Sequence, residues 1–186
     1  MAITTLDPRT ALVVIDLQTG IVAREGVHPI SDIVAKAAKL ASTFRTQNLP
    51  VILVRVTATA PGRSDLSPGG SIDIPEEFAR LVPELDQQPQ DHVIEKRTWG
   101  AFVNTDLHDY LTSQGVTQVV LAGISTSIGV ESTARQAYEA GFNVTLALDA
   151  MTDTNADAHE NSTTRIFPRL GETGSTEDII DLLNSR

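Results

Sequence analysis

Gly123-Ile-Ser-Thr-Ser-Ile-Gly-Val-Glu-Ser-Thr-Ala-Arg135 is the stretch that decides the fold. It follows the apolar run Val119-Val-Leu-Ala122, which is typical of a buried strand, and leads into Ser132–Ala140, whose spacing predicts a helix that ends at Gly141. A strand that breaks at glycine and turns directly into a helix leaves backbone N–H groups facing open space, where they favour a negative charge. Many α/β enzymes carry a nucleophile at such a turn. Here the residue at the apex of the turn is Gly129, which has no side chain.

Length and composition indicate one globular domain over residues 1–186. The net charge of −10 argues against a nucleic-acid-binding surface. The sequence contains no cysteine, which excludes disulfides, thiolate metal sites and a cysteine nucleophile. The first residues lack the basic and apolar regions of a signal peptide, and no apolar run approaches the roughly 20 residues of a membrane helix. We therefore expect a cytoplasmic protein.

Strand-like and helical segments alternate along the chain, which predicts an α/β fold with a parallel sheet and helices on both of its faces. The expected strands span residues 11–15, 51–56, 92–95, 116–122 and 142–148. The expected helices span about 31–47, capped by Ser31 or Asp32, a segment ending at Gly115, 132–140, 156–167, stopped by Pro168, and a last helix that follows the capping-box sequence Ser175–Asp178.

Residues 57 to about 90 interrupt this alternation with a long connection rich in proline and glycine. Connections of this length in a compact domain are usually functional or disordered. Because the alternation resumes afterwards, we interpret the segment as a rim of the site or a contact with a partner, and not as a linker between domains.

Notable residues follow the ends of three predicted strands: Asp16, Lys96 and the turn from Gly123 to Gly129. Ligands of parallel sheets bind at the carboxyl ends of the strands, so these residues are expected to converge on one crevice. A partly desolvated carboxyl group such as Asp16 is suited to proton transfer. The alternative is structural, because a carboxylate can also cap a turn and a lone lysine is usually a solvated charge.

Three ordered motifs together resemble the isochorismatase-like hydrolase superfamily, and the resemblance covers nearly the whole chain. The motifs are Ala11–Gln18, Lys96–Phe102 and Leu121–Arg135. The resemblance implies a three-layer α/β/α fold with a mostly parallel, six-stranded sheet of Rossmann-like order, and a cis peptide at Ile124–Ser125. It also implies a homo-oligomer, a dimer or tetramer, acting on a small molecule. It implies no cofactor, and the scattered histidines predict no metal site.

The catalytic residues implied by the resemblance are Asp16, Lys96 and the position of Gly129, where amide-hydrolysing relatives have cysteine. Amide hydrolysis by that route needs a thiolate nucleophile, which Gly129 cannot supply. The sequence resembles the isochorismatases proper and a bacterial glycine-for-cysteine subgroup in this respect. Their chemistry implies protonation of a vinyl ether by Asp16, with Lys96 as its partner. Three alternatives stay open: an altered relative that only binds a small ligand, a structural role, and, less favoured because no histidine base lies in the motifs, a serine nucleophile near the turn.

Further residues are candidates for contact with the substrate. They are Gln18, Ile124, Ser125, Trp99 and Phe102. Arg97, and less strongly Arg24, could contact a carboxylate ligand, and His28 could line the site. The turn carries Ser125, Thr126 and Ser127 where isochorismatases usually have aromatic residues and histidine, so the sequence does not name the substrate.

Overall fold

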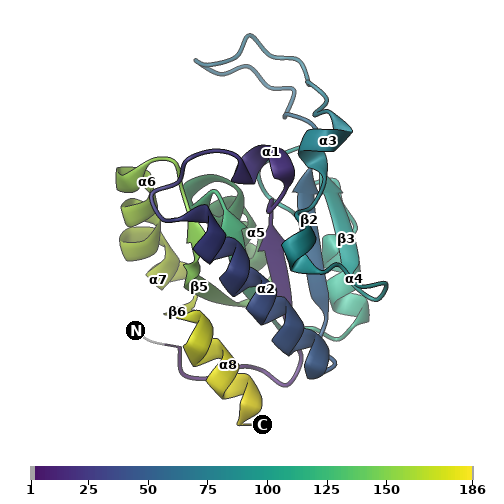
Figure 1. The fold of residues 1–186 in the computed structure, drawn as a ribbon, viewed down its shortest axis with the longest axis vertical. Coiled ribbons are helices and arrows are strands. Elements are labelled where there is room, and N and C mark those ends of the chain that lie inside the picture. Colours follow the sequence, from purple (N-terminus) through teal and green to yellow (C-terminus); the bar gives the residue numbers. More distant parts are fainter. Residues whose placement is uncertain (1–2, 186) are drawn as a thin grey trace.

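The computed structural model describes residues 3–185 and has the predicted three-layer α/β/α architecture (Figure 1). Its sheet has six strands in the order β3-β2-β1-β4-β5-β6, and every neighbouring pair is parallel. The strands are β1 (Thr10–Ile15), β2 (Val51–Val56), β3 (His92–Lys96), β4 (Gln118–Ile124), β5 (Asn143–Thr152) and β6 (Glu172–Gly174). The predicted sheet is thus confirmed, although the sequence analysis placed only the first five strands, because β6 is short and carries little apolar pattern.

The central strand β1 shows why the sheet is buried on both faces. Leu12 and Val14 point into one hydrophobic cluster, and Val13 and Ile15 point into the other. Successive side chains of a strand alternate between faces, so a continuous apolar run fits only a strand that is covered on both sides. The predicted strand at residues 11–15, buried on both faces, is confirmed by the structure.

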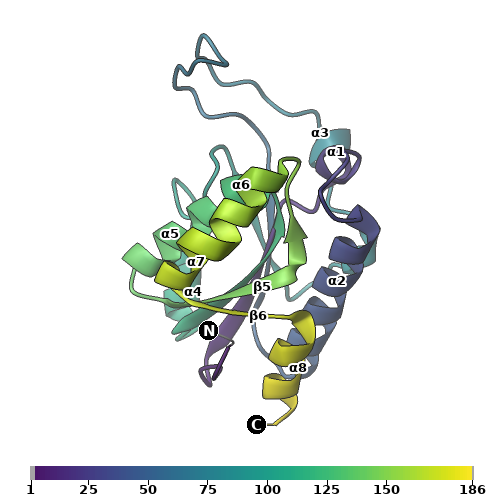
Figure 2. The ribbon, with the colours of Figure 1, turned by 90° about the vertical axis from the view of Figure 1, so that its left-hand side faces the viewer.

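Two groups of helices form the outer layers (Figure 2). Helices α2 and α8 pack on one face of the sheet, while α4, α5 and α7 pack on the other. The helices are α1 (Thr19–Val22), α2 (Ile30–Thr46), α3 (Glu76–Ala79), α4 (Leu107–Ser113), α5 (Glu131–Glu139), α6 (Ala156–Asn161), α7 (Phe167–Leu170) and α8 (Thr176–Asn184).

The helix ends agree only in part with the predicted signals. The capping box at Ser175 and Asp178 is present at the start of α8. The cap predicted for α2 is wrong, because this helix begins at Ile30 after Pro29 and makes no side-chain cap. Pro168 does not stop the preceding helix either, since it lies in the first turn of α7. A proline is tolerated there because the first turn needs no N–H donor.

An arm formed by residues 57–75 rises from the carboxyl ends of the strands, above the body of the molecule (Figure 1). Its two legs are joined by backbone hydrogen bonds from Thr59 N to Ile72 O (2.9 Å) and from Ile74 N to Thr57 O (2.8 Å). Leu66, in the arm, is 98% exposed. The role of this segment in contact with a second copy of the chain stays a prediction.

Candidate active site

The site lies where the strand order reverses. From β1 the chain continues to β2 and β3 on one side, whereas β4, on the other side of β1, continues to β5 and β6. Asp16 directly follows β1, and the turn that begins after Ile124 directly follows β4. Two neighbouring strands whose connections diverge leave a crevice at their carboxyl ends, which is the usual ligand position in open α/β sheets.

Asp16 and Lys96 form a buried ion pair in this crevice. Lys96 Nζ lies 2.7 Å from Asp16 Oδ2, and the two residues are only 2% and 4% exposed. Lys96 ends β3, whose register pairs it with Val56 of β2. Its side chain therefore has to extend past the end of β2 to reach Asp16 beside β1.

The other oxygen of the Asp16 carboxyl group has no partner. Among residues 3–185, Asp16 Oδ1 is the buried side-chain atom that lacks a hydrogen bond. Burial raises the pKa of Asp16 from 3.8 to about 6 and outweighs the charge and the hydrogen bond of Lys96, which both lower it. At neutral pH a minor but substantial fraction of Asp16 is therefore protonated.

All three N–H donors of the Lys96 ammonium group are used in contacts within the protein. Besides Asp16, it donates to the carbonyl oxygens of Thr98 (3.2 Å) and Trp99 (2.7 Å). An ammonium group has three N–H donors, and these contacts use all of them. Lys96 is thus placed to stabilise the ionised form of Asp16, and has no donor left for a ligand.

The turn between β4 and α5 brings Gly129 against this ion pair. A β-carbon at Gly129 would lie 2.9 Å from Ile15 Cγ2, 3.2 Å from Asp16 Oδ2 and 3.6 Å from Lys96 Nζ. The turn needs a second glycine at Gly123, which has a φ of +122° and where a β-carbon would lie 2.0 Å from Ile15 O. The peptide bond Ile124–Ser125 is cis, as the family resemblance implies.

Asp153, which follows β5, holds the same turn in place through hydrogen bonds. Its Oδ2 accepts hydrogen bonds from the backbone N–H and the hydroxyl group of Ser127, both at 2.8 Å. Its Oδ1 accepts from the N–H groups of Thr154 (2.8 Å) and Asn155 (3.2 Å). A buried carboxylate with four donors needs no cation, so Asp153 holds the turn without disturbing the Asp16–Lys96 pair.

These elements enclose a cavity of about 390 Å³ that has a charged end and an apolar wall. Asp16, Lys96 and Gly129 line it together with Ser125. Its apolar lining comes from Ile21, Val56, Ile74, Phe78, Trp99, Ile124 and Ile128. Concave apolar sites with a few convergent polar groups are typical ligand sites of enzymes.

Comparison with known proteins assigns the chain that carries this site to a protein family. The family model described as the isochorismatase domain matches residues 10–178. The chain belongs to the isochorismatase family. It is 43% identical over 180 residues to the uncharacterised isochorismatase family protein YecD of Escherichia coli O157:H7, which covers 94% of this chain and 96% of that relative.

Two further comparisons agree with this assignment. The chain is 39% identical to the uncharacterised isochorismatase family protein YwoC of Bacillus subtilis, over 93% of each chain. The structure superposes on that of an isochorismatase family protein from Burkholderia thailandensis with a TM-score of 0.93 and 42% identity, over 98% of this chain and 100% of that one. We therefore describe the chain as an isochorismatase-family hydrolase.

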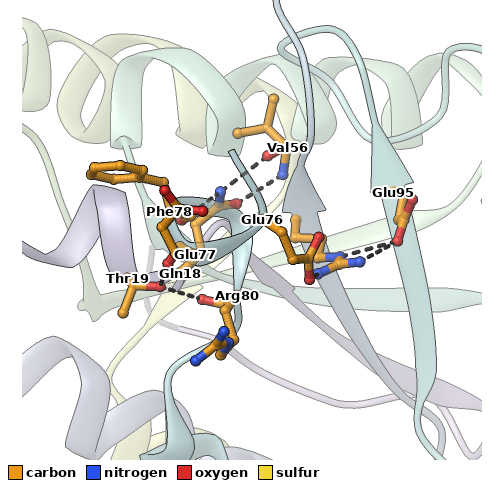
Figure 3. Close-up of polar contacts among 9 residues, drawn as sticks. Gln18, Thr19, Val56, Glu76, Glu77, Phe78, Arg80 and Glu95 are labelled. Carbon is orange, nitrogen blue, oxygen red and sulfur yellow. Dashed lines mark hydrogen bonds and ion pairs between the residues drawn. The ribbon is translucent and has the colours of Figure 1, made fainter. Parts of the chain in front are cut away.

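Gln18 lines the cavity of this family member, but its amide group is engaged by backbone atoms (Figure 3). Its Nε2 donates to the carbonyl oxygens of Val56 (3.0 Å) and Phe78 (3.3 Å), and its Oε1 accepts from Val56 N (2.8 Å). Val56 directly precedes the arm and Phe78 follows shortly after it, and we call these two places the roots of the arm. Arg55 and Glu76, beside the same two places, form an ion pair (2.8 Å). Gln18 therefore joins the loop after β1 to both roots of the arm.

The remaining predicted residues are divided between the cavity and other places. Trp99, Ile124 and Ser125 line the cavity. Phe102 does not, because it packs against the hydrophobic cluster around α5, with its ring 6.0 Å from that of Phe142. Arg97 pairs with Asp73 at 2.7 Å, away from the cavity lining.

The histidine at position 28 has a partner that the sequence analysis did not anticipate. The ring of His28 lies 4.9 Å from that of His159, and His159 Nδ1 lies 2.9 Å from the hydroxyl group of Thr126 in the turn. Burial is the main cause that lowers the pKa of His159, and the neighbouring His28 lowers it further. This histidine is therefore neutral at physiological pH. Neither ring lines the cavity.

Asp153 and three residues of the apolar lining, Ile21, Ile74 and Phe78, were not predicted as site residues from the sequence. An acidic residue directly after a buried strand was a usable signal for Asp153. The wall residues gave no such signal, because isolated apolar residues in loops are common. Within residues 3–185, no three acidic or histidine side chains are grouped so that they could hold a metal ion, and none of the helices is long and apolar enough to span a membrane.

Proposed function

We propose that this protein hydrolyses a small vinyl ether, with Asp16 as the general acid and base and Lys96 as its electrostatic partner. The observation that carries the proposal is the asymmetry of the Asp16 carboxyl group. One oxygen is held by Lys96 at 2.7 Å, and the other is buried beside the cavity without a partner. A pKa of about 6 allows this group both to donate and to accept a proton near neutral pH.

In the proposed reaction, protonated Asp16 gives its proton to the enol carbon, and an oxocarbenium ion forms. The resulting Asp16 carboxylate is stabilised by Lys96. Water then adds to the cation and returns a proton to Asp16, and the hemiketal collapses to a carbonyl compound and an alcohol. The protein ends the cycle in its starting state, and no nucleophilic side chain is required.

Two features of position 129 support a route without an acyl-enzyme. Gly129 offers no nucleophile, and the chain contains no cysteine elsewhere. In addition, Ile15 Cγ2 would lie only 2.9 Å from a β-carbon at Gly129, so the space that a nucleophilic side chain would occupy is already crowded.

The absence of a nucleophile at position 129 also favours a second candidate function, a relative that has lost hydrolysis and binds a small ligand in the cavity.

The test is turnover of a panel of small vinyl ethers and small amides by the wild-type protein and by Asp16→Asn. We expect turnover of a vinyl ether that falls at least about a hundredfold in Asp16→Asn, because general acid–base catalysis contributes about 10²–10⁴-fold. Asp157→Asn is the matched control, since Asp157 is an exposed acid in the first turn of α6. Circular dichroism and urea unfolding establish that both variants are folded.

Unchanged turnover in Asp16→Asn would exclude Asp16 as the acid. Hydrolysis of amides in place of vinyl ethers would exclude the proposed reaction. Binding of panel compounds without turnover of any of them would favour the second candidate.

A further inference from the structure

The loop that follows β3 holds Lys96 through its carbonyl oxygens. Lys96 Nζ donates to the carbonyl oxygens of Thr98 (3.2 Å) and Trp99 (2.7 Å). Between the end of β3 and the start of α4, residues 97–106 form neither a strand nor a helix. Regular secondary structure therefore does not fix the position of these two oxygens, and side chains of another element have to do so.

Helix α5 supplies the contacts that hold this loop. The backbone N–H group of Ala101 donates to Thr133 Oγ1 (3.2 Å), and that of Phe102 donates to Gln136 Oε1 (3.1 Å). The two acceptors are three residues apart on α5, and therefore lie on the same side of the helix. Gly100 permits this approach, because a β-carbon there would collide with the Gln136 amide group. The loop is thus held to α5 directly after the two carbonyl groups that bind the lysine.

The hydroxyl group of Thr133 also holds the turn that carries Gly129. Thr133 Oγ1 donates to Gly129 O at 2.7 Å, and the same oxygen accepts from Ala101 N. A threonine in a helix often donates to the carbonyl group four residues earlier, and that bond by itself is structural. The second bond differs, because it reaches a loop 32 residues away in the chain. Thr133 is 0% exposed, so water cannot take the place of either partner.

We propose that Thr133 is a positioning residue that keeps Lys96 against Asp16. It does so by holding the loop after β3, with Gln136 as a second support. Its hydroxyl group joins the two segments beside the ion pair, namely the turn at Gly129 and the loop whose carbonyl oxygens bind the lysine. Thr133 does not line the cavity, so it acts through Lys96. This inference rests on the proposed function for the part that Asp16 plays in the reaction, but not for the position of the ion pair.

The test follows the titration of Asp16 and needs no turnover. Carbon-13 NMR of the Asp16 carboxyl carbon gives the titration midpoint in the wild-type protein, Thr133→Val and Thr133→Ser. Because the charge and the hydrogen bond of Lys96 lower the pKa of Asp16, displacement of Lys96 should raise the midpoint. We expect a rise of about one pH unit in Thr133→Val, which keeps the shape of the side chain and loses both hydrogen bonds. Thr133→Ser keeps the hydroxyl group and should titrate as the wild-type protein does.

Thr43→Val is the matched control. The Thr43 hydroxyl group donates to Lys39 O, four residues earlier in α2, and Thr43 does not line the cavity. Its loss should leave the midpoint of Asp16 unchanged. Circular dichroism and urea unfolding establish which variants are folded. If Thr133→Val does not fold, Gln136→Ala takes its place, because Gln136 is only partly buried and its removal frees the Phe102 N–H group.

The proposal is supported if the midpoint rises in Thr133→Val, or in Gln136→Ala where that variant replaces it, and not in Thr133→Ser. It is overturned if the folded variant has the midpoint of the wild-type protein, or if Thr133→Ser shifts the midpoint as far as Thr133→Val does. Because no reaction is measured, loss of the proposed hydrolase function would not by itself alter either result.

Discussion

Asp16 Oδ2 and Lys96 Nζ lie 2.7 Å apart, in side chains that are 6% and 2% exposed. This contact joins the ends of β1 and β3, which are separated in the sheet by β2. It leaves the second carboxyl oxygen of Asp16 unpartnered beside the cavity.

The first prediction concerns the pH dependence of kcat/KM for a vinyl ether. Because Asp16 acts in its protonated form, kcat/KM should be constant in acid and fall about tenfold per pH unit above about 6, the pKa raised by burial. Initial rates measured across this range, with circular dichroism at each pH, give the profile. A rate that instead rises through the same pKa would assign the ionised carboxylate, acting as a base, to the limiting step.

The second prediction concerns the stability of Lys96→Met. Without Lys96, the buried Asp16 carboxylate has no cation, so its pKa in the folded protein rises further above the value of 3.8 that it has when unfolded. A raised pKa of a folded carboxyl group costs stability as the pH rises through that pKa. The variant should therefore lose about 3–5 kcal/mol at neutral pH and less in acid, where Asp16 is neutral.

Urea unfolding at acid and at neutral pH measures this difference. Lys39→Met is the matched control, because Lys39 forms an ion pair with Glu177 in which both side chains are more than half exposed. Its removal should change the free energy of unfolding by about 0–1 kcal/mol at either pH. An equal loss for Lys96→Met at both pH values would show that Asp16 titration does not govern the stability of this site.

The third prediction concerns small side chains at position 129. Replacing glycine by alanine in a helical turn normally stabilises by up to about 1 kcal/mol. At Gly129 the β-carbon would lie 2.9 Å from Ile15 Cγ2, a methyl group at the branched β-carbon of a buried strand residue, which cannot rotate away freely. Overpacking of this kind costs about 1–3 kcal/mol, so Gly129→Ala and Gly129→Cys should both be destabilised.

Thermal and urea unfolding of these variants provide the measurement. Gly62→Ala is the control, because a β-carbon at Gly62 has no heavy atom within 4 Å. A Gly129→Cys protein as stable as the wild type would show that the turn relaxes easily. In that case, any amidase activity it gained would indicate that this site can also support a thiolate route.

The fourth prediction concerns the roots of the arm. Gln18→Ala removes the acceptor of Val56 N and the donor to the Phe78 carbonyl group. Because Gln18 joins both roots, amide hydrogen exchange at Thr59 and Ile74, which bond across the arm, should become about tenfold faster, equivalent to about 1.4 kcal/mol. Gln87→Ala, at an exposed position, is the control. Faster exchange at Val56 alone would restrict the effect of Gln18 to its direct partner.

The sequence by itself determined the α/β class, the parallel sheet and the positions of the candidate site residues along the chain. Residues 11–15 are apolar at every position, and only a strand covered on both faces buries them all. Glycine at position 123 was predicted to end the strand, but it lies within β4, where the close approach of Ile15 O excludes a side chain. Local patterns of this kind act over a few residues, and can be interpreted without knowing the rest of the fold.

Only the tertiary structure decided which of these residues share the cavity. Phe102 and Arg97 lie within the same motif as Lys96, yet one packs into the core and the other pairs with Asp73. Arg24, the weaker candidate from the sequence, lines the cavity. The direction of a side chain depends on how distant elements pack. Burial, which raises the pKa of Asp16, likewise depends on the packing of all the strands and helices around it.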